Sequence, residues 1–122
     1  MAKGEITHVE IPADDIERAK RFYGAVAGWE FDTMEGHPDY WLFRTSDESG
    51  GAIGTRGASV SGVVRAYITV DSLEDGVEAA TANGGSVVAE PTDVPGQGRF
   101  AAVRDPEGNE IGLWQTVEND WG

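Results

Sequence analysis

The chain has 122 residues, of which 39% are hydrophobic, so it is long enough for one compact domain with a modest core. Its 22 acidic and 9 basic residues give a formal net charge of -13, which disfavours nucleic acid as a partner because phosphate binding depends on Lys and Arg. There is no cysteine for a disulfide or a thiolate metal site, and no apolar run of about 18 residues that would predict a membrane span.

These properties predict a cytoplasmic protein with neither a membrane nor a nucleic acid among its partners. Two explanations of the acidity stay open. One is a high-salt source, where concentrated salt screens the repulsion between carboxylates, and the other is the ordinary solubility of an acidic protein.

The first half of the chain is predicted to form a strand, a helix and three further strands. Val9 and Ile11 alternate with His8 and Glu10, which indicates a half-buried strand whose apolar face meets the helix. Asp14, with Glu17 three residues later, indicates a helix start, and the helix is predicted over residues 15–26. Its inner face is predicted to hold Ile16, Ala19, Phe22 or Tyr23, and Val26. Strands are predicted over 29–33, 40–45 and 51–56.

The second half repeats this pattern, because residues 8–17 align with residues 65–74 at a constant offset of 57. The Gly- and Ser-rich stretch 57–62 is the predicted linker. The second helix is predicted over 72–82 with Asp71 as its cap, and residues 105–108 are predicted to form a type I turn. The remaining strands are predicted over 86–90, 98–104 and 109–116.

Duplication of one unit explains this repetition. We therefore predict an α+β fold of two tandem βαβββ modules in a single domain over residues 1–122, with the first module at about 5–56 and the second at about 63–116. The sequence leaves open whether residues 118–122 fray or dock through Trp121.

Two groups of motifs resemble the vicinal oxygen chelate superfamily, which includes glyoxalases, bleomycin resistance proteins and dioxygenases. They are His-Val-Glu-Ile-Pro-Ala-Asp-Asp at 8–15 with Phe-Tyr-Gly at 22–24 and Gly-Trp-Glu-Phe at 28–31, and Pro-Thr-Asp at 91–93 with Gly-Arg-Phe at 98–100 and Asp-Pro-Glu-Gly-Asn at 105–109. The resemblance implies a curved mixed sheet that forms a cup for a small molecule, with the helices on its convex side. It is specific for the fold and much less so for a reaction.

The resemblance also implies where a metal ion would be bound. The equivalent ligand positions are His8 and Arg65 on the first strands, and positions near Gly54 and at Gly112 on the last strands. Only His8 can donate a lone pair to a metal ion, so we predict no metal and no other cofactor. A rearranged site, in which Glu10 and Glu110 replace the missing ligands, is the alternative.

The concave face is predicted to bind the ligand, since it combines aromatic walls with a few polar groups. On strand 40–45, either Trp41 and Phe43 or Tyr40 and Leu42 are expected to join it. Each residue also has a structural interpretation, as a sheet hydrogen bond, an ion pair or core packing, and His37 is predicted to lie exposed in a loop. The predicted ligand-binding residues are His8, Glu10, Trp41, Arg65, Tyr67, Phe100, Glu110 and Trp114.

The leading functional hypothesis is a metal-independent small-molecule site, used for binding or for an uncharacterised reaction with His8 and Glu10 as candidate catalytic residues. The alternative is a metal-dependent, glyoxalase-like lyase, isomerase or dioxygenase that uses His8 in a rearranged site. A third possibility is a partner protein whose fold has lost its pocket. The resemblance further implies a homodimer, while the ligand and the presence of catalysis stay open.

Overall fold

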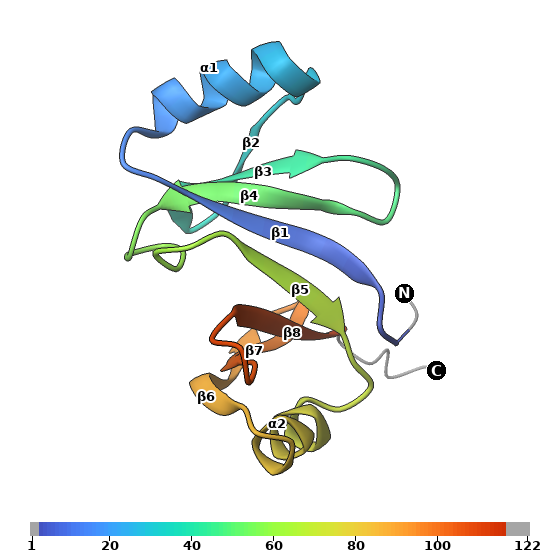
Figure 1. The fold of residues 1–122 in the computed structure, drawn as a ribbon. Coiled ribbons are helices and arrows are strands. Elements are labelled where there is room, and N and C mark those ends of the chain that lie inside the picture. The colour runs from blue at the N-terminus through green and yellow to red at the C-terminus, as the bar shows by residue number, and fades with distance from the viewer. Residues whose placement is uncertain (1–2, 117–122) are drawn as a thin grey trace. The chain divides into compact units, whose positions relative to one another are not determined.

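The computed structural model describes residues 3–116, so the expectation for residues 118–122 lies outside the described residues. The elements follow each other as β1 (Ile6–Ala13), α1 (Ile16–Ala27), β2 (Asp32–Met34), β3 (His37–Arg44), β4 (Gly50–Thr55), β5 (Arg65–Thr69), α2 (Leu73–Ala82), β6 (Ser86–Val94), β7 (Gly98–Arg104) and β8 (Glu110–Thr116). Figure 1 shows this order along the chain. The βαβββ pattern occurs twice, which confirms the predicted α+β fold class.

The chain divides into two compact units. Among the described residues, we call 7–66 the N-terminal unit, and 67–116 together with 3–6 the C-terminal unit. Backbone hydrogen bonds from Gly4 to Thr69 and from Thr69 to Glu5 join the two parts of the C-terminal unit. The predicted linker lies between β4 and β5. Arg56, just before it, donates hydrogen bonds to the Gly62 carbonyl and to the Asp14 carboxylate.

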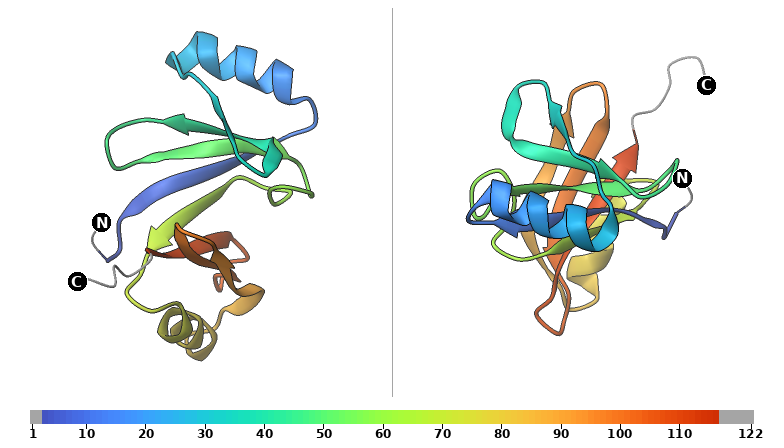
Figure 2. Two further views of the ribbon diagram at one scale, coloured as in Figure 1. Left: turned by 180° about the vertical axis from the view of Figure 1, so that it is seen from behind. Right: turned by 90° about the horizontal axis from the view of Figure 1, so that it is seen from above.

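The sheet of the N-terminal unit has the strand order β2-β3-β4-β1. β1 and β4 are parallel, with Glu10 opposite Ala52, and β3 and β4 are antiparallel, with Leu42 opposite Ala52. Because side chains alternate along a strand, His8, Glu10, Tyr40 and Leu42 share one face of this sheet. The other face carries Val9, Ile11 and Ile53, and α1 packs against it over β4. Figure 2 shows α1 lying across these strands.

Aromatic rings fill the helix side of the N-terminal unit. The rings of Trp29 and Phe43 are stacked with their centroids 3.9 Å apart, and Tyr23 stacks on Trp29 at 5.3 Å. Gly51 makes this possible, since a Cβ atom there would lie 2.7 Å from the Phe43 ring. Tyr23 is thus the inward residue of the predicted pair with Phe22.

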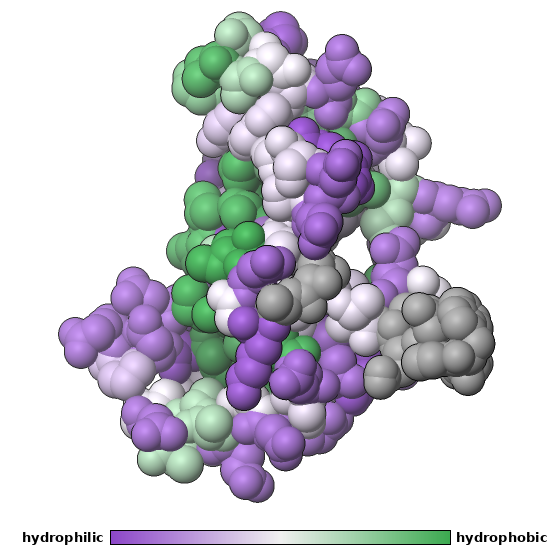
Figure 3. All heavy atoms as spheres, turned by 90° about the vertical axis from the view of Figure 1, so that its right-hand side faces the viewer, coloured by the Kyte–Doolittle hydropathy of each residue, from purple (hydrophilic) through white to green (hydrophobic). Residues whose placement is uncertain are grey.

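Val26, which was predicted on the inner face of α1, is exposed, and so is Phe22, the alternative to Tyr23 on that face. Phe22 is 57% exposed and Val26 is 68% exposed, so the predicted inner position of Val26 is wrong. Hydrophobic side chains are visible over α1, at the top of the view in Figure 3. Part of the helix face toward the sheet is taken by Lys20, whose Nζ lies over the Trp41 ring.

The sheet of the C-terminal unit has the strand order β5-β8-β7-β6. One face packs against α2 and forms a core of Leu73, Ala101, Val103 and Leu113, with Val77 and Ala80 of the helix packed against it. The face of the sheet away from α2 carries Tyr67, Phe100 and Trp114. In the strand register, Phe100 is paired with Trp114, and Tyr67 is paired with Gly112.

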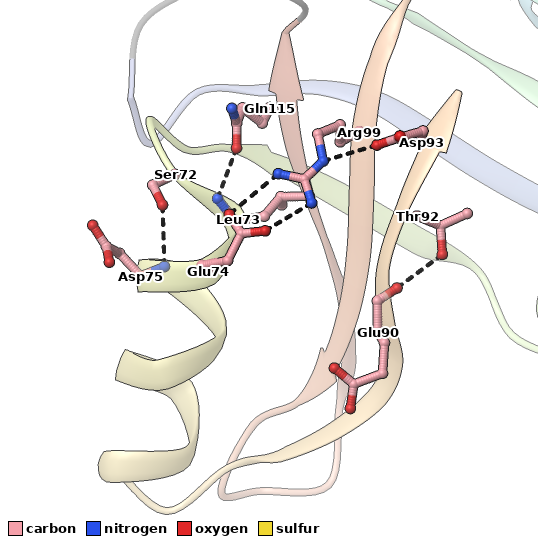
Figure 4. A network of polar contacts seen from close by, with 9 residues as sticks. All are labelled: Ser72, Leu73, Glu74, Asp75, Glu90, Thr92, Asp93, Arg99 and Gln115. Atoms are coloured by element: carbon pink, nitrogen blue, oxygen red, sulfur yellow. Dashed lines mark hydrogen bonds and ion pairs between the residues drawn. The ribbon is translucent and has the colours of Figure 1, made fainter. Parts of the chain in front are cut away.

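A charged cluster fixes α2 to the edge of this sheet, as Figure 4 shows. The Arg99 guanidinium donates to both carboxylate oxygens of Glu74, at 3.2 and 2.7 Å, and to Asp93 at 2.9 Å. The hydrogen bonds that Glu74 accepts from Arg99 lower the pKa of its exposed carboxyl. Gln115 accepts from the backbone N–H of Leu73, which supplies a further contact between α2 and β8.

The N-cap of each helix lies one residue later than the predicted cap. Asp15, and not Asp14, is the N-cap of α1 and accepts from the Arg18 N–H at 3.0 Å. Ser72, and not Asp71, is the N-cap of α2 and accepts from the Asp75 N–H. The choice between adjacent acidic residues depends on Arg56, which binds the Asp14 carboxylate and holds it away from the helix.

The assignment of Asp15 as the N-cap of α1 can be tested by substitution. Asp15→Ala is expected to lower the free energy of unfolding by about 1 kcal/mol, because it leaves the first-turn N–H groups of α1 without their side-chain acceptor. Asp14→Ala is the matched control and is expected to cost less, since its ion pair with Arg56 is exposed. Urea denaturation of both variants checks this, and an equal or larger loss for Asp14→Ala would contradict the assignment.

Strand boundaries agree with the prediction for most elements, with three differences. The second strand runs from Asp32 to Met34 and not over 29–33, because Trp29 leaves the sheet to stack in the helix layer. His37 is exposed as predicted but lies in β3 and not in a loop. β6 continues to Val94, past the predicted end at residue 90. The turn at 105–108 is confirmed by a hydrogen bond from the Gly108 N–H to the Asp105 carbonyl.

Candidate functional site

Three polar side chains meet on the sheet face of the N-terminal unit that is opposite α1. The Tyr40 hydroxyl donates to Glu10 Oε2 at 2.6 Å, and His8 Nε2 lies 2.9 Å from the same hydroxyl. His8 and Glu10 come from alternate positions of β1, and Tyr40 reaches them from β3 across the glycine-rich strand β4. We call these three residues the polar triad.

The hydrogen bonds of the triad define the protonation of His8. Because the single phenolic proton of Tyr40 is donated to Glu10, the hydroxyl oxygen accepts from His8, which places a proton on Nε2. Burial lowers the pKa of His8 below its ordinary value, and the nearby Glu10 carboxylate partly opposes this by raising it. The imidazole is therefore neutral at physiological pH, with Nδ1 as its basic nitrogen.

The triad has the groups needed for ligand recognition. The side chain of Glu10 is only 12% exposed, whereas that of His8 is 32% exposed, so the imidazole is the more accessible end. A neutral imidazole, a phenol and a carboxylate linked in series can accept a proton, donate one, or bind a cation through the carboxylate.

The sequence left open which face of its strand Tyr40 occupies. Its hydrogen bonds place the pair Tyr40 and Leu42 on the face of His8 and Glu10. Trp41, a predicted ligand-binding residue, lies on the opposite face, where Lys20 Nζ is 3.4 Å from its ring centroid. We therefore correct that assignment, since the ring of Trp41 packs against α1 and is not near the triad.

Three other predicted residues lie together on the C-terminal unit. The rings of Tyr67 and Phe100 are in edge contact with centroids 6.4 Å apart, and Trp114 lies opposite Phe100 on the neighbouring strand. We call Tyr67, Phe100 and Trp114 the aromatic face. Tyr67 is buried, while Phe100 and Trp114 are half-buried.

Arg65 and Glu110 stand at the starts of β5 and β8, respectively. Arg65 is buried and Glu110 is half-buried. The prediction that Arg65 meets His8 stays a prediction, as does a ligand-binding role for both residues.

The residues at the predicted metal positions do not fit a metal ion. Tyr67 is the repeat equivalent of Glu10. Tyr67 lies opposite Gly112 and Glu10 lies opposite Ala52, so the last-strand position that was predicted near Gly54 falls at Ala52. Neither Ala52 nor Gly112 carries a ligand atom. At Gly112 the space is also filled, because a Cβ atom there would lie 2.3 Å from Cδ2 of Tyr67.

His8 and Glu10 are a close pair of possible ligand groups at these positions. Within residues 3–116, no group of three or more His, Cys, Asp or Glu side chains is arranged to hold a metal ion. His8 Nε2 and Glu10 Oε2 are 3.9 Å apart, and they supply two ligand groups at most.

Within residues 3–116, neither helix is long and apolar enough to cross a membrane.

Comparison with known proteins gives a consistent family. The family model described as Glyoxalase/Bleomycin resistance protein/Dioxygenase superfamily matches residues 5–113. "Putative glyoxylase CFP32" from Mycobacterium tuberculosis is 34% identical over 108 residues, which are 86% of this chain and 41% of that protein. The chain thus spans about two-fifths of the length of this curated relative.

Solved structures show the same fold at low identity. Hypothetical protein BH1468 from Bacillus halodurans matches with a TM-score of 0.72 and 16% identity, covering 97% of this chain and 98% of that one. Methylmalonyl-CoA epimerase from Streptomyces coelicolor, in complex with 2-nitronate-propionyl-CoA, matches with a TM-score of 0.65 and 17% identity, covering 96% and 100%.

Proposed function

Since the chain belongs to the Glyoxalase/Bleomycin resistance protein/Dioxygenase superfamily, we propose that it binds a small organic molecule at the polar triad without a metal ion. The observation that carries this proposal is the hydrogen-bonded series from His8 through Tyr40 to Glu10. Apolar side chains would be enough to pack this face of the sheet. A carboxylate, a phenol and a neutral imidazole joined by hydrogen bonds instead offer polar groups to a ligand.

The charge of the site favours a ligand with a cationic or hydroxyl-bearing group. Glu10 accepts a hydrogen bond from Tyr40, and the net charge of -13 attracts cations toward the protein. A reaction at this site would be a proton transfer, with His8 and Glu10 as the acid–base groups and Tyr40 as the residue that connects them.

A ligand screen tests the proposal. We expect cationic and hydroxylated metabolites, screened in EDTA by thermal shift and then by calorimetry, to include compounds that bind with 1:1 stoichiometry. Tyr40→Phe and Glu10→Gln are each expected to weaken this binding by about tenfold or more, because a charge-assisted hydrogen bond is worth about 1.5–3 kcal/mol. His37→Gln, at the exposed start of β3, is the control and is expected to leave affinity unchanged.

Metal-dependent lyase, isomerase or dioxygenase chemistry is the second candidate function. The observation in its favour is that His8 and Glu10 approach within 3.9 Å on one face. Metal analysis of protein purified without chelator separates the two candidates. Stoichiometric metal that is lost in His8→Ala, together with ligand binding that EDTA abolishes, would contradict metal-independent binding and support this alternative.

We also propose that the protein is a cytoplasmic homodimer. The exposed Phe22 and Val26 on the outer side of α1 support an interface between copies, because exposed apolar side chains at helical spacing favour burial on association. Sedimentation equilibrium measures the oligomeric state, and a monomer at all accessible concentrations would contradict it.

A further inference from the structure

The loop between β4 and β5 is fastened to the sheet of the N-terminal unit by hydrogen bonds. We call residues 56–62 of this loop the strap (Figure 1). Arg56 donates its backbone N–H to the Ala13 carbonyl at the end of β1, at 3.0 Å. Ser59 donates its hydroxyl to the Asp39 carbonyl of β3, at 2.8 Å. The strap is therefore tied to the two strands that flank β4.

One side chain of the strap is inserted against β4. Residues 56–59 are exposed, but Val60 is only 6% exposed. A Cβ atom at Gly54 would lie 2.6 Å from Cγ1 of Val60 and 3.3 Å from its Cγ2. The Val60 methyl groups therefore occupy the place where the side chain of residue 54 would stand, and the absence of a side chain on Gly54 allows this close approach.

The place that Val60 occupies is beside Tyr40, on the face of the polar triad. Gly54 is paired with Tyr40, and it lies on the same face of β4 as Ala52, which is paired with Glu10. Side chains directly opposite each other on neighbouring strands have Cβ atoms about 4.5–5.5 Å apart and pack together. Val60 thus supplies the cross-strand neighbour that Gly54 cannot give to Tyr40.

Tyr40 has to reach diagonally over the sheet to join the triad. Its partners Glu10 and His8 are paired with the residues of β4 that precede Gly54 by two and by four positions. The position straight across from Tyr40 is filled by Val60, so the phenol ring is directed away from the strap and toward Glu10. Removing Val60 would open a second direction for the ring, over Gly54.

We propose that Val60 is a positioning residue for the polar triad, because the strap holds it where it directs the Tyr40 hydroxyl toward Glu10. Binding groups are most effective when the packing around them fixes their geometry in advance. The inference rests on the proposed function, since it states how the residues proposed to bind a ligand are held before the ligand arrives. Val60 acts through Tyr40 and not by contact with the ligand.

The hydroxyl proton of Tyr40 gives a direct measurement. Proton NMR of the ligand-free protein in EDTA is expected to show a hydroxyl signal that exchanges slowly with water, because it is donated to Glu10. Its loss in Tyr40→Phe assigns the signal. In Val60→Ala this proton is expected to exchange about tenfold faster or more, the factor that corresponds to losing a hydrogen bond to a charged group.

Val103→Ala is the matched control. Val103 is also 6% exposed, but it belongs to the core of the C-terminal unit and not to the strap. The same truncation at this buried position is expected to lower stability to urea while the exchange of the Tyr40 proton stays unchanged. This comparison separates positioning of the phenol from a general loss of stability.

A glycine pair decides the question if Val60→Ala does not fold. Gly54→Ala places a methyl group against the side chains of Val60 and Ser59, and it is expected to push the strap away and speed the exchange of the Tyr40 proton. Gly62→Ala adds the same methyl group within the strap, where no atom lies within 4 Å, and is expected to change nothing. Circular dichroism establishes which variants are folded.

Unchanged exchange in folded Val60→Ala overturns the inference, as does unchanged exchange in Gly54→Ala if Val60→Ala is unfolded. Equal acceleration in Val103→Ala overturns it too, and so does the absence of any hydroxyl signal that Tyr40→Phe removes. If the EDTA screen finds a ligand for the triad while Val60→Ala leaves the exchange unchanged, the proposed function stands and this inference fails. If the exchange responds as expected and the screen finds no ligand, the reverse holds.

Discussion

Gly112→Ala is expected to lower the free energy of unfolding by about 1–3 kcal/mol, the usual cost of adding volume to a well-packed position. The added methyl group would stand 2.3, 2.5 and 2.7 Å from Cδ2, Cε2 and Cγ of Tyr67. Tyr67 is 4% exposed, so its ring has little room to move away. The three nearest atoms therefore all belong to the Tyr67 side chain.

A double-mutant cycle tests this cause directly. Tyr67→Ala alone is expected to cost about 3–5 kcal/mol, as other large aromatic truncations do. Adding Gly112→Ala to that variant is expected to cost little, because the atoms that the methyl group would meet are gone. Urea denaturation of the four proteins gives the coupling energy, and Gly62→Ala is the control, expected within about 0.5 kcal/mol of the unchanged chain.

Additive effects in this cycle would mean that the cost of Gly112→Ala comes from the backbone and not from the Tyr67 ring.

The expected non-additivity has a functional consequence. Position 112 is where the family resemblance places a metal ligand, and a longer side chain meets the same ring there. A metal-binding side chain at 112 would therefore require a change at Tyr67 as well.

The internal repeat predicted the first strand and helix of the second module closely. α1 begins at Ile16 and α2 at Leu73, which keeps the offset of 57 residues. The offset does not hold after the helices, because Glu10 pairs with Ala52 while its equivalent Tyr67 pairs with Gly112. Loop and strand lengths differ between modules there, and a single sequence contains no signal that locates such insertions.

The faces of the strands were predictable only in part. Alternation separates Tyr40 from Trp41, but it cannot say which of them shares a face with His8. That choice is made by the pairing of β3 with β4, where Leu42 lies opposite Ala52, and by the hydrogen bonds of Tyr40 to Glu10 and His8. In the second module, the predicted shared face of Tyr67, Phe100 and Trp114 agrees with the strand register.

Local hydrogen bonding decided the features that periodicity could not. Asp14 and Asp15 are both good N-cap residues, and the contact between Asp14 and Arg56, which are 42 positions apart, leaves Asp15 as the cap. Phe22 and Tyr23 are both apolar enough to face inward, and the stack of Tyr23 on Trp29 decides between them. Such long-range contacts are not visible in local sequence patterns.

Acidification is expected to destabilise the protein through His8. Burial lowers the pKa of His8 in the folded chain, so the unfolded chain, with a pKa near 6.5, takes up a proton first as the pH falls. The contribution of His8 to stability is fully present above about pH 6.5. It is lost between that pH and the folded pKa, at up to about 1.4 kcal/mol per pH unit, and does not change further below the folded pKa.

The measurement is the difference in free energy of unfolding between the unchanged protein and His8→Gln, followed from pH 8 to pH 5. Taking this difference cancels the titration of the 22 acidic residues, which both proteins share. His37→Gln, measured in the same way, is the control for removal of an exposed imidazole. In a Glu10→Gln background the loss is expected to extend to lower pH, because the carboxylate that raises the pKa of His8 is absent. A difference that stays constant over this range, or that grows in favour of the unchanged protein on acidification, would contradict a buried, neutral His8.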